Sequence, residues 1–413
     1  MNRSSVSKSP TTPAGISLQG RSFSSGIFSP LQIDNFPSAS ITSAGVIPAP
    51  RRMEATIRSD PESSEGMTTA WKEDPWQVAE HDFPRYAAPE AQLRFLLNYA
   101  VLAPSVHNTQ PWRFRVVGSE VELYADRTRA LAVADPEDRQ LIMSCGAALF
   151  HLQVAMRHFG YQPQVRLLPD PDDPDLLAFV RLGPPEPATL LDHRLFQAIK
   201  KRHTNRLPFE NRPVPEAELR ALERAVEQEG AHLVVIRQKE KRYELAELIT
   251  EADRIQTADP RFRRELAAWT HPARNESKDG LPLTARGLQE WLGPAGPLVL
   301  RTFLWARGQV ARDRQLAEGS PVLLVLLTER DEPLAWLQAG QALDRLLLQA
   351  ADYGLSASFL NQPIEVPEMR KKLRDWLGTE AWPQTILRLG YGPAVPPTPR
   401  RPVHEVLLQS RYL

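Results

Sequence analysis

The sequence predicts an α+β fold in which two similar halves are joined in one chain. Alternating apolar residues at 112–117 and 121–124 predict two antiparallel strands separated by a Gly-Ser turn. A long helical pattern at 146–161 aligns without a gap with another at 340–355, and both reach a glycine near their ends. Similar elements surround both helices, so each half is expected to hold a mostly antiparallel sheet flanked by helices.

Residues 1–75 are predicted to be a disordered extension. They are rich in Ser, Pro, Thr and Gly and have no sustained period, so they bury too little surface to offset the entropy of ordering. The first fifty residues are also poor in acid, as organelle transit segments are. No amphipathic, Arg-rich helix accompanies that composition. A tail, or an early start codon with Met53 or Met67 as the true start, is therefore the preferred interpretation.

The first half is assigned to residues 76–190. Apolar residues at helical spacing predict a helix at 91–103, ahead of the strand pair. A longer helix is expected at 138–159, where Gly160 supplies the left-handed conformation of a helix C-cap. Extended segments then follow at 165–168 and 177–180.

The second half is assigned to residues 191–413 and begins after a Pro-rich join. Its first expected elements are helices at 195–201 and 216–228 and a strand at 232–236. An insertion of about sixty residues, at about 260–318, precedes the apolar strand 321–327. Because this insertion contains apolar helical stretches, it is predicted to be ordered and functional.

Composition excludes several classes of function. Lys+Arg and Asp+Glu are both 50, and this zero net charge gives no reason to expect nucleic-acid or anionic-membrane partners. No apolar run reaches the roughly 18 residues of a membrane span. Cys145 is the only cysteine, so it is expected to be a small buried residue, and neither an intrachain disulfide nor a cysteine zinc cluster can form. A cytoplasmic location is expected.

Motifs of other catalytic chemistries are absent from the sequence. It contains no G-x-S-x-G elbow, no H-E-x-x-H and no P-loop. His151 and His158 share a helix face but are about two turns, or roughly 10 Å, apart, which is too far to bind one ion. They are interpreted as ordinary helix surface, and the acidic run 135–138 as a helix N-cap, so no metal site is predicted.

Two segments resemble the flavin-binding signatures of the nitroreductase family. Residues 103–112, APSVHNTQPW, are similar to the family's P-S-x-x-N-x-Q-P-W loop, and residues 201–206, KRHTNR, to its R-x-[ST]-x-[RK] turn. The helices at 146–161 and 340–355 resemble the family's central core helix. With DPEDRQLIMSCGAAL, FRRELAAW and PPTPRRPV, the resemblance runs from about residue 77 to 408 and is nearest to the Acg-like branch of fused proteins.

The order of the two segments is the reverse of the family's usual order. In ordinary nitroreductases each flavin is bound by the turn of one subunit and the loop of the other. Here the first half keeps the loop and lacks the turn, while the second half keeps the turn and lacks the loop. The resemblance therefore implies a head-to-tail pseudo-dimer with one complete flavin site. Such a chain is expected to be a monomer with internal pseudo-two-fold symmetry.

The resemblance assigns cofactor-binding residues at four places. They are Ser105, Asn108 and Gln110 in the loop, Arg202, Thr204 and Arg206 in the turn, Gln362, Pro363, Ile364 and Glu365 behind the flavin ring, and Arg400 and Arg401 near the C-terminus. Arginines suit the flavin phosphate because they form charge-assisted, bidentate hydrogen bonds. Trp112 is expected in the core, and His107 as a positional filler rather than a proton donor.

The implied function is an FMN-dependent oxidoreductase. Hydride would pass from NAD(P)H to flavin N5 and then to a small nitroaromatic or quinone-type acceptor, and no protein side chain is assigned as catalytic because the flavin carries the chemistry. Two alternatives stay open. One is an FMN-sequestering stress protein, in which the insertion is a lid closed over the flavin. The other is an azoline oxidase or flavin-consuming enzyme.

Overall fold

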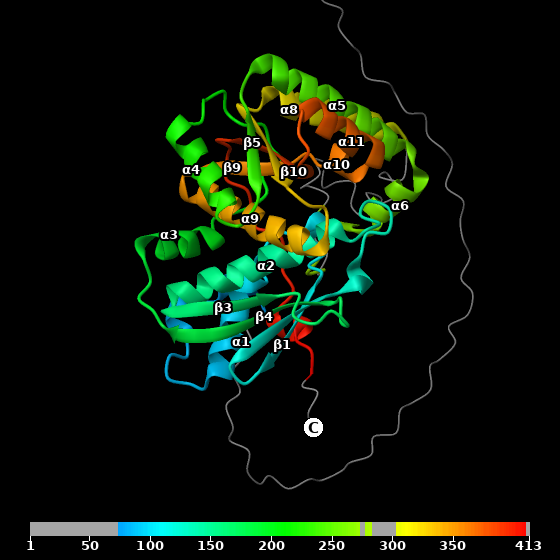
Figure 1. Cartoon of the computed structure of the whole chain (residues 1–413). Coiled ribbons are helices and arrows are strands. Elements are labelled where there is room, and N and C mark those ends of the chain that lie inside the picture. Colours follow the sequence, from blue (N-terminus) through cyan, green and yellow to red (C-terminus); the bar gives the residue numbers. More distant parts are fainter. Residues whose placement is uncertain (1–72, 273–276, 283–302, 410–413) are drawn as a thin grey trace, which may run out of the picture. The chain divides into compact units, whose positions relative to one another are not determined.

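The computed structural model describes residues 73–272, 277–282 and 303–409 (Figure 1). These residues belong to one compact unit, Thr68–Leu413. The predicted disorder of residues 1–75 falls almost entirely outside the described residues. Within the described ranges, no helix has both the length and the apolar character that crossing a membrane requires.

The α+β fold is confirmed, with two four-stranded antiparallel sheets. The first sheet has the order β1 (Trp112–Val117), β2 (Glu120–Ala125), β4 (Leu176–Pro185) and β3 (Tyr161–Leu167). The second has the order β5 (His232–Ile236), β8 (Val322–Thr328), β10 (Trp382–Gly390) and β9 (Ser356–Phe359). The two sheets therefore have the same topology: if the strands of each sheet are numbered along the chain, neighbours in the sheet follow the order first, second, fourth, third.

Helices occupy matching places in the two halves. The first half contains α1 (Pro89–Ala100) and α2 (Arg139–His158). The second half begins with α3 (Leu190–Ile199) and continues with α4 (Glu216–Glu227), α5 (Lys239–Ala258), α6 (Pro260–Ala268), α8 (Phe303–Gly319), α9 (Pro333–Asp352), α10 (Gln362–Glu365), α11 (Pro367–Leu377) and α12 (Val403–Val406). Within the described residues, short 3-10 helices lie at Pro75–Gln77, Glu80–Asp82, Val106–Asn108 and Arg127–Arg129. Helices α2 and α9 each follow the second strand of their sheet and lie between the two sheets (Figure 1).

The two long helices touch through their glycines. A Cβ atom on Gly340 would lie 2.0 Å from the carbonyl oxygen of Met143, and one on Gly146 would lie 2.2 Å from that of Leu337. Only residues without a side chain allow the two backbones to approach so closely. The two glycines that align in the sequence repeat are therefore the residues at which α2 and α9 meet.

Apolar side chains from both halves form the core around these helices. Trp112 is fully buried, which confirms its predicted place in the core. Cys145 is also buried, and its thiol lies 3.2 Å from the carbonyl oxygen of Pro111. Burial raises the pKa of this thiol, so Cys145 is a small core residue and not a nucleophile.

The acidic run 135–138 caps the N-terminus of helix α2, as predicted. Asp138 occupies the N-cap position with a left-handed backbone and no side-chain capping hydrogen bond, and the carboxylate of Asp135 accepts hydrogen bonds from the backbone N–H groups of Gln140 and Leu141 at 3.1 and 2.9 Å. The interpretation of His151 as helix surface is wrong. His151 is fully buried and not on the surface, with Nδ1 3.5 Å from a carboxylate oxygen of Asp344. Burial lowers the pKa of His151 and raises that of Asp344, which favours the neutral form of both.

The C-terminal segment returns to the first half. The indole N–H of Trp76 donates to the carbonyl oxygen of Thr398 at 3.0 Å. Leu407 forms a parallel bridge with Phe114 on β1, and the backbone N–H of Leu408 donates to the carbonyl oxygen of Phe114 at 2.7 Å. Although the boundary assigned at residue 190 stays a prediction, residues near the C-terminus lie on the first sheet.

Candidate functional site

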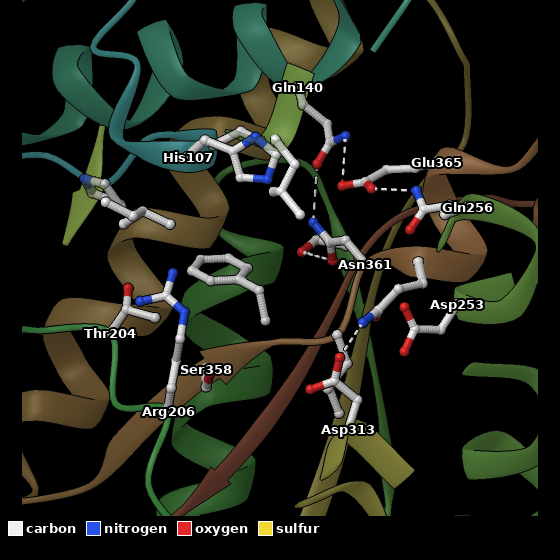
Figure 2. A pocket seen from close by; sticks show the side chains of 18 of the residues that line it. His107, Gln140, Thr204, Arg206, Asp253, Gln256, Asp313, Ser358, Asn361 and Glu365 are labelled. Carbon is white, nitrogen blue, oxygen red and sulfur yellow. Dashed lines mark hydrogen bonds between the residues drawn. The ribbon is translucent and has the colours of Figure 1, made fainter. Parts of the chain in front are cut away.

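One cavity is lined by residues from both halves (Figure 2). Its empty volume is about 1330 Å³, including the space at its mouth. The first half supplies Pro104, Ser105 and His107 of the loop and Gln140, Met143, Ser144 and Ala147 of α2. The second half supplies, among others, Thr204, Arg206, Asp253, Phe262, Asp313, Leu343, Phe359, Asn361, Glu365 and Arg388. The cavity thus combines apolar walls with polar and charged groups, as small-molecule sites do.

The loop of the first half has an unusual backbone. His107, Asn108 and Gln110 have positive φ angles of 49°, 56° and 52°. Asn tolerates this left-handed region, whereas His and Gln rarely adopt it, so the surrounding contacts must maintain the conformation. One such contact is the hydrogen bond from the backbone N–H of Gln110 to the hydroxyl of Ser105 at 2.9 Å.

The side chain of Asn108 joins the loop to two distant segments. Its amide donates to the carbonyl oxygens of Gly280 at 2.9 Å and Pro399 at 3.1 Å. Its side-chain oxygen accepts a hydrogen bond from Arg400 Nη1 at 2.9 Å. All hydrogen-bonding groups of this buried amide are therefore used within the protein.

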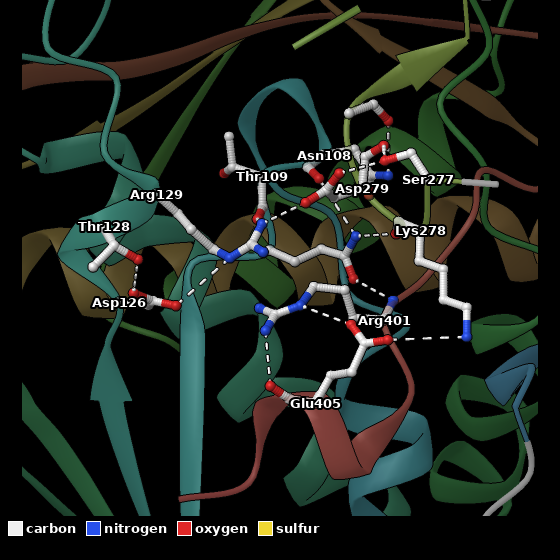
Figure 3. A network of polar contacts seen from close by, with 12 residues as sticks. Asn108, Thr109, Asp126, Thr128, Arg129, Ser277, Lys278, Asp279, Arg401 and Glu405 are labelled. Carbon is white, nitrogen blue, oxygen red and sulfur yellow. Dashed lines mark hydrogen bonds and ion pairs between the residues drawn. The ribbon is translucent and has the colours of Figure 1, made fainter. Parts of the chain in front are cut away.

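Gln110 joins the same segments by a parallel set of contacts. Its side-chain oxygen accepts from the backbone N–H of Arg401 at 2.8 Å, and its amide donates to the carbonyl oxygen of Lys278 at 2.7 Å. Arg129 and Asp279 add an ion pair of 2.7 Å (Figure 3). Burial alone would raise the pKa of Asp279, but the hydrogen bonds from Arg129 and Ser277 outweigh it and lower the pKa. Part of the insertion, residues 277–282, is thereby fixed to the loop.

The described parts of the insertion are ordered. Besides α6 and α8, they form a short parallel pair, β6 (Thr270–His271) with β7 (Leu281–Pro282). Phe262 and Leu266 of α6 pack against Leu131 and Ala134 of the first half. Residues 273–276 and 283–302 of the insertion, including Trp291, lie outside the described residues.

The turn of the second half is held by the second sheet. Thr204 forms a bridge with Ala357 on β9, and Arg388 on β10 donates to the carbonyl oxygen of Asn205 at 2.6 Å. These contacts place Thr204 and Arg206 on the wall of the cavity (Figure 2). Burial lowers the pKa values of Arg206 and Arg388 to about 10, against the opposing effect of Asp313.

Two further arginines converge behind the loop. Arg202 Nη2 and Arg400 Nη2 lie 3.4 and 3.2 Å from the same carbonyl oxygen, that of Leu102. Both side chains are buried, and in the described part of the chain neither Nε atom has a hydrogen-bond partner. Burial, and then the charge of Arg202, lowers the pKa of Arg400 to about 9. Two guanidinium groups that meet without a hydrogen-bonded carboxylate are the donor set that an anion requires.

The predicted site residues divide into two groups. Five line the cavity: Ser105, Thr204, Arg206, Gln362 and Glu365. The others, all buried nearby or in adjoining segments, do not line it: Asn108, Gln110, Arg202, Pro363, Ile364, Arg400 and Arg401. Their assignment to a cofactor stays a prediction.

Sequence reasoning missed the acidic side of the cavity. Asp253 and Gln256 of α5, Asp313 of α8, and Gln140 of α2 all line it. A signal was present in α5, where Asp253, Gln256 and Thr257 are polar residues at helical spacing on the buried face. Polar residues on a buried face require partners or a ligand.

Comparison with known proteins establishes the family. The model of the nitroreductase family matches residues 199–391. Rv3131 of Mycobacterium tuberculosis, by name a candidate NAD(P)H nitroreductase, is 34% identical over 325 residues, which cover 77% of this chain and 92% of that protein. The chain belongs to the nitroreductase family. A second relative named in the same way, acg of Mycobacterium tuberculosis, is 32% identical over 327 residues. The alignment covers 76% of the present chain and 94% of acg.

Solved structures of nitroreductases match about half of the chain. One such structure is a nitroreductase with bound FMN from Desulfitobacterium hafniense. The match covers 53% of the present chain and 98% of the Desulfitobacterium chain, with 14% sequence identity and a TM-score of 0.33. The two mycobacterial relatives align with 77% and 76% of this chain, whereas the family model matches only residues 199–391, beginning just before the turn.

Proposed function

We propose that this member of the nitroreductase family binds one FMN per chain and reduces small acceptors with NAD(P)H. The observation that carries the proposal is that the loop of the first half and the turn of the second half line one cavity. FMN bound in nitroreductase structures and the names of the mycobacterial relatives support this choice of cofactor and reductant. Nitroaromatic and quinone compounds are the proposed acceptors.

The residues present fit FMN. A phosphate needs cationic donors, and Arg202 and Arg400 have buried Nε atoms without a hydrogen-bond partner in the described part of the chain. The isoalloxazine ring needs apolar walls with polar groups at its edge, and Met143, Leu343 and Phe359 line the cavity together with such groups. When bound, FMN would supply the electron and hydride chemistry.

The protein would bind and orient the cofactor and exclude water. Arg202, with Arg400, would hold the phosphate, while Thr204 and Arg206 would hold the part of FMN that lies inside the cavity. Asn108 would act indirectly, because its side-chain oxygen positions Arg400. Of the segment 362–365, Gln362 would offer its backbone N–H to the ring, because Pro363 has none and the N–H groups of Ile364 and Glu365 both donate to the carbonyl oxygen of Asn361.

The first test is a spectrum of the purified protein before and after anaerobic NADPH. We expect flavin absorption with one FMN per chain, and loss of that absorption on mixing with NADPH. A yellow protein that stays oxidised with both NADPH and NADH would refute the reductase proposal and leave FMN binding intact. Two FMN per chain would refute the single-site arrangement. Light scattering is expected to show a monomer.

Replacing Asn108 by alanine is expected to lower FMN occupancy at least several-fold. The change removes the side-chain oxygen that accepts from Arg400 and leaves the carbonyl oxygen of Gly280 without its donor, while that of Pro399 keeps only its hydrogen bond from Arg400. Asn98→Ala is the matched control, since Asn98 is also a buried amide but lies on α1 outside the cavity lining. Equal occupancy in the two variants would contradict a role of Asn108 at the flavin site.

A further inference from the structure

Three carboxyl groups line one side of the cavity (Figure 2). Asp253 comes from α5, Asp313 from α8 and Glu365 from the end of α10. The side chain of Asp253 belongs to a residue that is only 3% exposed, and its Oδ2 atom has no hydrogen-bond partner in the part of the chain that the structure describes. A buried carboxyl oxygen that faces a cavity without a partner needs an explanation.

The other two carboxyl groups accept hydrogen bonds from amides. Glu365 Oε1 accepts from Gln140 Nε2 at 3.2 Å, and Glu365 Oε2 accepts from Gln256 Nε2 at 2.6 Å. Asp313 accepts from Gln309 at 2.8 Å and from Gln362 at 2.8 Å. Amide N–H groups donate to a carboxylate and so favour its ionised form.

Nearby cations favour ionisation of the same two groups. Asp313 interacts with Arg206 and Arg388, and Arg312 also lines the cavity. Arg139 lowers the pKa of Glu365, against burial and the charge of Asp135. For Asp253, the interacting charges are those of Asp313 and Glu365, and both are negative.

The proton of the cluster is therefore held by Asp253. Three carboxylates in a desolvated cavity repel one another, so at neutral pH the group with the least compensation stays protonated. Asp253 is that group, because burial and its two acidic neighbours all act against its charge. Its pKa is accordingly raised to about 8, by burial first, while burial raises that of Glu365 to about 7.

We propose that Asp253 is the proton donor to the acceptor that this enzyme reduces. The inference rests on the proposed function. Reduction of a quinone to a hydroquinone consumes one hydride and one proton; the hydride comes from the reduced cofactor, and the proton leaves the carboxyl O–H of Asp253. The O–H bond of Asp253 breaks, an O–H bond forms on the quinone oxygen, and Asp253 remains a carboxylate until water returns a proton.

The first test needs no turnover. Infrared spectra of the oxidised protein at pH 7 should contain absorption of protonated carboxylic acids that shifts in deuterated water. Burial also raises the pKa values of Glu365 and Asp344, so the band of Asp253 is identified as the component that disappears as the pH rises through about 8 and that is missing from Asp253→Asn. Glu251→Gln, which changes an exposed carboxyl on the same helix, should retain this component. Identical spectra of wild-type protein and Asp253→Asn in this region would overturn the proposal.

The second test separates proton transfer from electron transfer. Enzyme reduced anaerobically with NADPH is mixed either with a benzoquinone, which takes up a proton, or with ferricyanide, which does not. For Asp253→Asn we expect reoxidation by the quinone to be slower by roughly 100-fold, with reoxidation by ferricyanide unchanged. A structural defect would slow both reactions, and equal slowing of both would overturn the proposal.

His107 also lines the cavity and is the competing donor. If His107→Asn slowed the quinone reaction selectively and Asp253→Asn did not, the assignment to Asp253 would be wrong. Flavin reduction by NADPH serves as the separate readout of the proposed function. If NADPH did not reduce the flavin of the wild-type protein, the proposed reductase function would be refuted. If NADPH did reduce the flavin and Asp253→Asn reacted with the quinone at the wild-type rate, only the role of Asp253 as proton donor would be refuted.

Discussion

Gly340→Ala is expected to destabilise the protein by about 3 kcal/mol or more, which places it among the most damaging single methyl additions in the chain. The new Cβ would lie 2.0 Å from the carbonyl oxygen of Met143, and a backbone atom of a packed helix cannot move aside cheaply. Helices α2 and α9 would have to separate, and both line the cavity through Met143, Ala147 and Leu343. Chemical denaturation, followed by circular dichroism, measures the change.

Gly308→Ala is the matched control for this prediction. Gly308 lies in helix α8, but a Cβ added there would meet no atom within 4 Å. Alanine has a higher helix propensity than glycine, so this variant is expected to be unchanged or more stable by up to about 1 kcal/mol. Similar denaturation midpoints for Gly340→Ala and Gly308→Ala would mean that the helices do not cross as closely as described.

Arg202→Met is expected to have opposite effects on stability and on FMN binding. In the cofactor-free protein it removes a buried guanidinium that faces Arg400 at Leu102, and so should raise the free energy of unfolding by about 1 kcal/mol or more. In the FMN-bound protein, the substitution removes a charge-assisted hydrogen bond from Arg202 to the FMN phosphate. FMN affinity should then fall by roughly 10- to 100-fold.

Denaturation of the cofactor-free variant and fluorescence titration with FMN measure the two effects. Arg220→Met is a suitable control, because Arg220 is an exposed residue on α4 whose ion pair with Glu216 spans one helical turn. That variant should change neither quantity appreciably. A loss of stability in cofactor-free Arg202→Met, or undiminished FMN affinity, would argue against an anion site at Arg202 and Arg400.

Much of the fold could be predicted from periodicity. The strand β5 has the predicted bounds, and most other elements begin and end within a few residues of their prediction. Helix α3 begins earlier than expected because Thr189 and Asp192 form a capping box ahead of its apolar residues. His151 was misplaced because a polar residue at helical spacing resembles a surface residue unless its buried partner, Asp344, is known.

The candidate site was predictable only where it is made of contiguous segments. The loop and the turn are short motifs, so the family resemblance could indicate Ser105, Thr204 and Arg206, which the structure places on the cavity wall. The acidic wall consists of single residues from α5, α8 and α10, and no local pattern relates Asp253 to Glu365. Their relation arises from helix packing, which depends on contacts far apart in the sequence.

The return of the C-terminal segment to the first sheet has a consequence for synthesis of the protein. The hydrogen bond between Arg400 and Asn108 joins residues 292 positions apart, and that between Trp76 and Thr398 joins residues 322 positions apart. A ribosome delivers Thr398 and Arg400 long after the loop, so the loop of the first half cannot acquire its final contacts until both sheets of the fold have emerged. The two halves are thus expected to mature together, and a first half released alone would expose the edge of β1 that Leu407 covers.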